Sequence, residues 1–278
     1  PADVRLNETQ ETLEVYNQKF EKLWELPSSV VKTTKRLEEL TGARYTVIAD
    51  LHGNDRHEVI TTLALPSEEK TGQSLKVFDA TMNLIGKRAP ETISVNYRGT
   101  HYDSPYSYET LVIENVLGTN RKNIIVAANN SRSPWFLLRL DDSLKTIGRY
   151  WHFGGFFGLR SIAMQEGKKE QLVVWGLNQA GALEKESTMA IVAMLDPSKI
   201  NGDKEATATR GFGHPSSDAE VFYVRFPESD IHKSLGLPPR VCLISREGEE
   251  TLRFMLSSQN ADVQPHFEFF LTKDFHVL

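Results

Sequence analysis

Cysteine is almost absent from this chain of 278 residues, in which Cys242 is the single one. No intrachain disulfide can form, and this excludes the small scaffolds that depend on disulfides. Long apolar runs are also missing: none approaches the roughly 18 residues of a membrane-spanning helix, so we expect no membrane insertion in this segment. Basic residues are not in excess, with 32 Lys and Arg against 37 Asp and Glu and a net charge of -5. This balance argues against nucleic acid as a partner.

Familiar catalytic motifs are missing as well. The sequence contains no P-loop, no Gly-x-Ser-x-Gly, no His-Glu-x-x-His and no dinucleotide-binding fingerprint. Helical patterns are confined to two short candidates, residues 34–40 and 230–235. The sequence therefore leaves enzyme activity open, favours a binding domain over an enzyme, and predicts no cofactor apart from the calcium considered below.

Short apolar segments separated by polar loops are what the chain does contain. The stretch from Tyr45 to Leu65 has two apolar runs around a polar loop with a glycine, which is the pattern of a strand, a turn and a second strand. Similar pairs follow at residues 110–128 and 159–176. We predict a fourth pair that joins residues 220–226 to residues 241–245.

A second, tighter hairpin pattern recurs between these pairs. Its turn residues are Asn17, Asp79, Asp141, Asp196 and Thr272, at intervals of 62, 62, 55 and 76 residues. Two equal intervals indicate a true repeat. One hairpin of each kind puts four strands in every period, and four strands make up the blade of a β-propeller.

The sequence thus predicts an all-β fold, a β-propeller of about five four-stranded blades that is complete or incomplete. We place a single propeller-like domain over residues 1–278. Its parts are a half blade at 12–27 and blades at about 28–88, 89–150, 151–200 and 201–278. Residues 1–10 and 201–218 are polar and are expected to be loose surface segments.

The loop from Asp50 to Glu58, DLHGNDRHE, resembles the calcium-loop signature of FG-GAP and VCBS-type propeller repeats. That signature is Asp-x-Asp-x-Asp-Gly with an acidic residue three positions later. The hairpin that ends Lys22-Leu23-Trp24-Glu25 is similar to the matching half blade, which quinoprotein-like repeats share. The resemblance implies a propeller of this kind.

The resemblance also implies calcium as a cofactor of this loop, held by Asp50, Asn54 and Glu58, because oxygen ligands spaced along a tight loop suit a hard cation. His52 and Asp55 depart from the signature. The alternative is a solvated turn in which Asp50 bonds its own backbone. Zinc held by His52 and His57 is a further alternative, and surface histidines are the simpler interpretation.

Two aromatic loops are candidate ligand sites. Residues 149–158 hold five aromatic side chains, a histidine and three glycines. We predict that Trp151 and His152 line a pocket for a planar or sugar-like ligand; the alternative is that this stretch packs one blade against the next. His101 and Tyr102 belong to a second polar aromatic loop, at residues 99–108, and are predicted to bind ligand there.

These observations favour a non-catalytic recognition domain whose loops, on one face of a propeller, bind a protein partner or a small ligand such as a glycan. The resemblance adds the sensor part of a bacterial envelope protein, periplasmic or extracellular. The first alternative is a glycan-acting enzyme with its site at the propeller face, where Asp50, His52 and His152 lie near loop ends. The second alternative is a structural repeat that binds no ligand. The sequence identifies neither the ligand nor the compartment.

Overall fold

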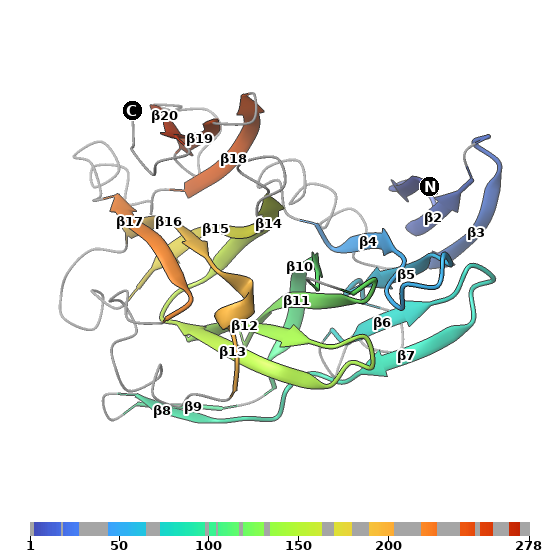
Figure 1. Ribbon diagram of the computed structural model, residues 1–278, viewed down its shortest axis with the longest axis horizontal. Helices are drawn as coiled ribbons and strands as arrows, with labels where there is room; N and C mark the ends of the chain where they lie inside the picture. Colours follow the sequence, from blue (N-terminus) through green and yellow to red (C-terminus); the bar gives the residue numbers. More distant parts are fainter. Residues whose placement is uncertain are drawn as a thin grey trace.

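The computed structural model is all-β, as the sequence predicts, and its strands form successive antiparallel sheets (Figure 1). The residues that the structure describes are 3–17, 19–27, 44–64, 73–97, 100–103, 105–116, 119–130, 134–162, 170–179, 189–202, 218–226, 240–247, 251–257 and 267–272. Both short helix candidates, most of the 201–218 insertion and the end of the fifth repeat lie outside these ranges.

Each sheet is a simple meander in which every strand pairs with the next one in the sequence. The first sheet holds β1 (Asp3–Asn7), β2 (Thr12–Tyr16) and β3 (Lys22–Pro27), and the second holds β4 (Thr46–Ala49), β5 (Glu58–Thr61), β6 (Leu75–Phe78) and β7 (Leu84–Arg88). The third holds β10 (Ser107–Asn115), β11 (Lys122–Asn129), β12 (Trp135–Leu140) and β13 (Thr146–His152). The fourth holds β14 (Phe156–Ile162), β15 (Gln171–Asn178), β16 (Met189–Leu195) and β17 (Glu220–Phe226), and the fifth holds β18 (Arg240–Glu247), β19 (Thr251–Ser257) and β20 (Phe267–Thr272).

Smaller elements connect these sheets. A hairpin of β8 (Val95–Tyr97) and β9 (Thr100–Tyr102) lies between the second and third sheets. A single 3₁₀ turn, Pro197–Lys199, follows β16. Among the described residues, no helix is long and apolar enough to cross a membrane.

The sheets are arranged as the blades of a propeller are. Their first strands contact one another in order: β4 contacts β10, β10 contacts β14, and β14 contacts β18. In Figure 1 the sheets follow one another in sequence colours around an arc, from the blue N-terminal sheet to the red C-terminal one. Three sheets have four strands each and two have three described strands each.

The interior lies between successive sheets, and β11 shows how. Ile124 and Val126 belong to a cluster shared with the second sheet, whereas Ile125 and Ala127 belong to a cluster shared with the fourth. Because neighbouring side chains of a strand point to opposite faces, a sheet covered on both faces needs an uninterrupted apolar run. The sequence from Ile124 to Ala128 is such a run.

The repeat of about 62 residues is confirmed in the turn geometry. In the turns of Asn17, Asp79 and Asp141, the side-chain Oδ1 accepts the backbone N–H groups of the residues two and four positions later, at 2.8–3.0 Å. The strand pair is out of register immediately before each turn, and the same shift precedes Asp196. These shifts lie at Val15/Tyr16, Val77/Phe78, Arg139/Leu140 and Met194/Leu195.

The same turns connect each sheet to the preceding one. Leu144, in the third-sheet turn, packs against Gly86 of β7: a Cβ on that glycine would lie 3.2 Å from its Cδ1. After β16, the backbone oxygen of Ile200 approaches Gly148 of β13 more closely still, at 2.6 Å from the position that a Cβ would take. Met82, in the second-sheet turn, packs against the apolar cluster that contains residues of the first sheet.

The predicted pairing of residues 220–226 with 241–245 is wrong. The first of these segments is β17, which pairs with β16 of the fourth sheet, and the second lies in β18, which opens the fifth. The prediction assumed that strands close in the sequence form a hairpin. The actual partner of β17 is β16, which more than twenty residues separate from it in the sequence. The fourth blade therefore takes in residues 220–226, beyond the boundary predicted at 200.

Two further local expectations are corrected. Residues 1–10 are not all loose, because β1 pairs with β2 over Asp3–Asn7 and the half blade predicted at 12–27 is a three-stranded sheet. Apolar residues alternate with polar ones in DVRLN, which is the pattern of a strand. The prediction missed it because the segment is short and the residues around it are charged. The repeat at Asp196 continues as a 3₁₀ turn, because Pro197 follows it and the side chain of Asp196 accepts the N–H of Ser198.

Candidate functional site

The Asp50–Glu58 loop, which was predicted to bind calcium, lies at one end of the propeller. The loop after β4 lies against the loop after β10: the backbone N–H of Lys122 donates to the carbonyl of Leu51 at 3.1 Å. Gly53 has a φ of +67°, and a Cβ there would lie 2.5 Å from the Cβ of Asn120, so a larger residue would separate the two loops. The tight turns at Asp79 and Asp141 lie at this same end, because strands one and three of a meander run in the same direction.

The three residues predicted to bind calcium hold the loop in shape. The two carboxylate oxygens of Asp50 accept the N–H groups of Asn54 and Asp55, at 3.0 and 2.9 Å. Asn54 Oδ1 accepts from the N–H of Arg56 at 3.0 Å, and the buried Glu58 carboxylate accepts from Leu51 at 2.9 Å. Partial desolvation raises the pKa of Asp50, but its backbone hydrogen bonds lower that pKa by more. The turn in which Asp50 bonds its own backbone is therefore present.

No metal cluster of the common kind is visible at this loop. Across the described ranges, no group of three or more His, Cys, Asp and Glu side chains lies close enough to hold a metal ion. His52 faces the next sheet, with its Nδ1 3.8 Å from Asp142 Oδ2. His57 lines the groove described next. Calcium at Asp50, Asn54 and Glu58 stays a prediction.

A groove of about 830 Å³ runs between the first two sheets, along the Asp50–Glu58 loop. Leu23 of β3 and Ile85 of β7 contribute apolar walls, and each is 50% exposed. The remaining lining is polar and comes from the loop and from two turns: Asn17, His52, Asn54, Asp55, Arg56, His57, Glu58, Asp79 and Thr81, with Ala80. The groove can therefore contact both apolar and hydrogen-bonding groups of a ligand.

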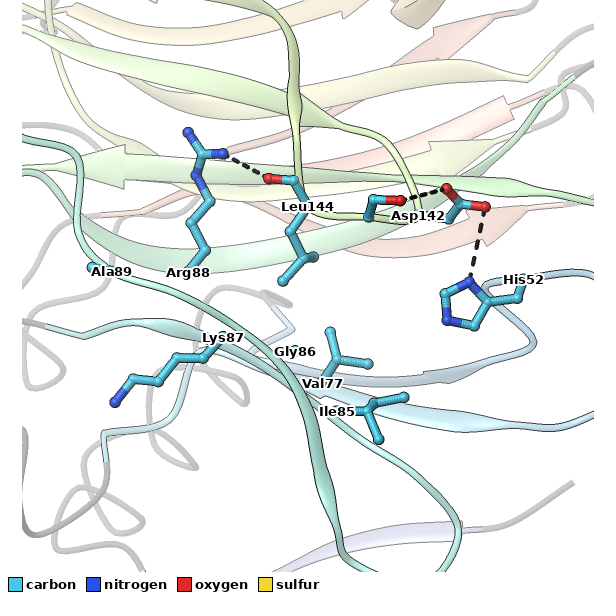
Figure 2. Close-up of a pocket in the computed structure, with 10 residues that line it drawn as sticks. His52, Val77, Ile85, Gly86, Lys87, Arg88, Ala89, Asp142 and Leu144 are labelled. Atoms are coloured by element: carbon cyan, nitrogen blue, oxygen red, sulfur yellow. Dashed lines mark hydrogen bonds and ion pairs between the residues drawn. The ribbon is translucent and has the colours of Figure 1, made fainter.

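A second cavity, of about 430 Å³, shares His52 and Ile85 with this groove and continues along β7 to Ala89 (Figure 2). Its far wall is the third-sheet turn from Asp142 to Leu144. Figure 2 shows the imidazole of His52 pointing at Asp142 across the cavity. Arg121 Nη1 lies 3.3 Å from the same carboxylate.

An ionic network fixes this cavity wall. Arg88 Nη1 donates to the carbonyl of Leu144 at 2.6 Å, and its Nε donates to Glu91 at 2.9 Å. Glu91 also accepts from Tyr108 at 2.7 Å and from Arg149 at 2.6 Å. Burial raises the pKa of Glu91, but these three donors lower it by more, so its carboxylate is ionised. The network joins the second sheet to the third beside the cavity.

Trp151 and His152 lie on opposite faces of β13, as neighbours on a strand must. Trp151 is 7% exposed and packs on Tyr106 and Phe136, with ring centroids 6.0 and 4.6 Å away. His152 is 3% exposed, and its Nε2 lies 2.8 Å from the hydroxyl of Tyr223 on β17. The two side chains thus belong to different sheet interfaces. Their role in binding ligand stays a prediction.

Two further polar contacts surround this histidine. Asn178 Nδ2 donates to the Tyr223 hydroxyl at 2.9 Å, and His152 Nδ1 lies 3.5 Å from the carbonyl oxygen of Gly154. Burial lowers the pKa of His152 to about 4, although the Gly154 carbonyl raises it slightly. His152 is therefore neutral at pH 7.

His101 and Tyr102 are far in the sequence from the groove and lie on the β8–β9 hairpin. Tyr102 is 8% exposed and meets Phe153 edge-on, with centroids 5.8 Å apart. His101 is exposed, with Nδ1 2.7 Å from Asn96 Oδ1 and Nε2 2.8 Å from Asp103 Oδ1. Of the two side chains only that of His101 is exposed, and both of its ring nitrogens have partners within the hairpin region. Binding at this hairpin stays a prediction.

Sequence reasoning missed the apolar walls of the groove, Leu23 and Ile85. Both stand on the last strand of a sheet, where an apolar residue has no following strand to cover it. The sequence did contain a signal for Ile85, because two large apolar residues, Leu84 and Ile85, directly follow the Asp79 turn. At the equivalent positions of the third sheet, Thr146 and Ile147, only one residue is apolar.

No protein-family model and no curated protein matches this sequence, so the resemblance to FG-GAP and VCBS repeats stays a prediction. Solved structures are similar in overall arrangement only. The crystal structure of BBS1N in complex with ARL6DN is 8% identical, with a TM-score of 0.39, and the match covers 99% of this chain and 86% of that one. A putative exo-β-1,3-galactanase from Bifidobacterium bifidum is 9% identical, with a TM-score of 0.35 and coverages of 98% and 87%. The V. cholerae biofilm matrix protein Bap1 is 10% identical, with a TM-score of 0.32 and coverages of 100% and 54%.

Proposed function

We propose that this chain is a non-catalytic recognition domain that binds a protein partner in the groove between its first two sheets. Of the five large apolar side chains that are exposed in the described part of the chain, four lie on the two hairpins that border this groove: Phe20, Leu23, Leu84 and Ile85. Exposed apolar side chains gathered beside polar ones mark interaction surfaces on soluble proteins. This concentration carries the proposal.

The chemistry of the groove favours a protein over a glycan. Its polar lining offers the amide of Asn54, the guanidinium of Arg56 and the hydroxyl of Thr81, and its apolar walls are aliphatic. The two aromatic side chains that were predicted to contact a ligand, Trp151 and Tyr102, are nearly buried. A polypeptide presents both apolar side chains and hydrogen-bonding groups to such a surface.

The wider setting comes from the resemblance alone. A sensor domain of a bacterial envelope protein would bind its partner protein through such a groove. Nothing in the groove depends on that setting, and the binding test below is independent of it.

The test is a selection of random peptides on the immobilised chain, followed by titration of the selected peptides against Leu23→Asp and Arg56→Glu. The matched control is Val221→Asp, which alters an exposed apolar residue of β17 outside the groove. We expect each groove variant to raise the Kd by about tenfold, or about 1.4 kcal/mol, and the control to leave it unchanged.

Two results would contradict the proposal. Peptides that bind the groove variants and the wild type equally would show that the groove is not the site. A thermal shift with a sugar that is lost in Trp151→Ala would instead favour recognition of a small ligand, or a glycan-acting enzyme if the sugar is cleaved.

A further inference from the structure

The repeated turn ends in a residue with a positive φ, and in two of its three copies this residue contacts the preceding sheet. Met82 packs against the apolar cluster that contains residues of the first sheet, and Leu144 packs against Gly86 of the second. Phe20 occupies the same place in the first sheet, with a φ of 61°. It is 66% exposed, the highest value among the exposed large apolar residues of the described chain.

The turn holds Phe20 in this conformation with hydrogen bonds that do not involve its ring. The backbone N–H of Phe20 donates to the carbonyl of Asn17 at 3.0 Å. Asn17 Oδ1 accepts the N–H groups of Lys19 and Glu21, at 2.8 and 3.0 Å, and its Nδ2 donates to Glu21 at 2.7 Å. The guanidinium of Arg5 lies over the phenyl ring, 5.2 Å from its centroid. The free chain therefore presents the ring in a defined position.

A bulky residue at this place lowers the stability of the free chain. Positive φ is unfavourable for a side chain of this size, and glycine or asparagine would avoid most of the cost. In the second and third sheets, packing against the preceding sheet offsets it. Phe20 belongs to none of the apolar clusters of the described residues. Strained residues are concentrated where their position serves binding or catalysis, so the strain at Phe20 indicates a role outside the fold.

The face of the first sheet beside Phe20 indicates what can cover the ring. Because Arg5 lies over the ring, Phe20 is on the Arg5 face of this sheet. On that face Arg5, Glu14 and Glu25 stand side by side across the three strands. The third sheet, in contrast, turns an apolar face to the second. A further blade packed on the first sheet would take these charges out of water, which is costly. A surface with one apolar pocket and a polar rim fits this face better.

We propose that Phe20 is the anchor residue of the interface, the side chain whose burial contributes most to affinity. The protein partner that occupies the groove also encloses the tip of the β2–β3 hairpin and takes the Phe20 ring into an apolar pocket with a polar rim. Asn17 of the same turn and Leu23, three residues after Phe20, both line the groove, so one partner can reach the groove and the ring together. Buried aromatic side chains commonly dominate the energy of an interface. This inference rests on the proposed function and names the residue that contributes most to it.

The test titrates the peptides selected on the immobilised wild-type chain against three variants of the full chain. Phe20→Asn removes the ring, and asparagine tolerates the left-handed conformation; Phe20→Tyr keeps the ring. The control is Val221→Ala, at an exposed apolar residue of β17. We expect Phe20→Asn to raise the Kd at least about tenfold, whereas Phe20→Tyr and Val221→Ala leave it within about twofold.

Stability separates a binding residue from a structural one. Because the ring is exposed and the backbone strained, Phe20→Asn should leave the urea midpoint unchanged or raise it while peptide binding is lost. A lower midpoint would overturn the inference, since the chain itself would then cover the ring. A wild-type dimer in sedimentation that Phe20→Asn dissociates would also overturn it, because a second copy would then be the cover.

The inference and the proposed function can be told apart in the same titrations. Peptides that lose affinity for Leu23→Asp but bind Phe20→Asn as tightly as the wild type would overturn the inference and leave the groove as the site. Peptides that ignore Leu23→Asp and Arg56→Glu, or a selection that returns no peptide, would contradict the proposed function and the inference with it.

Discussion

At the scale of single residues, this protein uses its polar side chains mainly to hold loops and sheet interfaces. His152 is the clearest case. It was a candidate ligand-binding residue in the sequence, and in the structure it is a neutral imidazole between the third and fourth sheets, with Nε2 2.8 Å from the Tyr223 hydroxyl. The same chemistry that makes histidine useful in a site makes it sensitive to pH in an interface.

We therefore expect the stability to fall as the pH falls from 6.5 to 4. The folded-state pKa of His152 is lowered to about 4 by burial, so between these values the unfolded chain binds a proton that the folded chain does not. The contribution of His152 is complete above pH 6.5 and decreases by about 3 kcal/mol at pH 4. Urea unfolding at several pH values measures it, and His152→Gln should remove this part of the slope. An unchanged slope in that variant would contradict the assignment.

Asp50 gives a second prediction at this scale. Both of its carboxylate oxygens accept backbone N–H groups of its own loop, so we expect Asp50→Ala to lower the melting temperature in the presence of EDTA. Asp103→Ala, an exposed acid at the β8–β9 hairpin, is the control and should have a smaller effect. If millimolar calcium raises the melting temperature of the wild type but not of Asp50→Ala, the loop holds the cation that the resemblance implies.

At the scale of elements, the repeated unit is the hairpin with a left-handed residue in its turn. Phe20, Met82 and Leu144 have φ values of 61°, 69° and 61°. Bulky residues rarely adopt this conformation, which costs roughly 1–2 kcal/mol. In the second and third sheets the side chain offsets this cost by packing against the preceding sheet. In the first sheet, Phe20 is 66% exposed and has Arg5 over its ring at 5.2 Å.

A matched pair of glycine substitutions separates strain from packing. Phe20→Gly relieves the positive φ and loses little burial, so we expect stability to be unchanged or higher by up to about 1 kcal/mol. Leu144→Gly relieves the same strain but loses the contact with Gly86, and we expect a decrease of about 1–2 kcal/mol. Denaturant midpoints measure both. A larger loss for Phe20→Gly than for Leu144→Gly would mean that Phe20 is buried against something in solution.

At the scale of the whole molecule, successive sheets are joined by buried charges as well as by apolar clusters. Glu91 accepts from Arg88 of the second sheet and from Arg149 of the third. A second pair, Glu114 and Arg139 at 2.8 Å, extends through Arg139 to Asn201 after the fourth sheet's turn. Removing one member of such a pair leaves its partner buried without compensation.

We expect Glu91→Ala to lower the free energy of unfolding by about 3 kcal/mol, since two guanidinium groups and the Tyr108 hydroxyl lose their acceptor. Asp103→Ala, at the exposed acid of the β8–β9 hairpin, is the control and should change it little. Urea denaturation followed by tryptophan fluorescence measures both. Retained stability would show that the network contributes little.

The fold could be anticipated because its signals are local. Asn17, Asp79 and Asp141 form their turns with backbone groups no more than four residues away, so a short pattern was enough to find all three. The apolar run of β11 likewise follows from being covered on both faces. In contrast, the partner of β17 lies across a long insertion, and the polar segment of β1 becomes a strand only because β2 pairs with it.

The sequence by itself determined the repeat, the strand and turn order and the Asp50 turn, because these depend on hydrogen bonds and side-chain alternation within a few residues. Only the tertiary structure decided that Trp151 and His152 face different interfaces, and that Leu23 and Ile85 form two walls of one groove. Those facts depend on how one sheet packs against the next, and packing between residues distant in the chain leaves no periodic signal in the sequence.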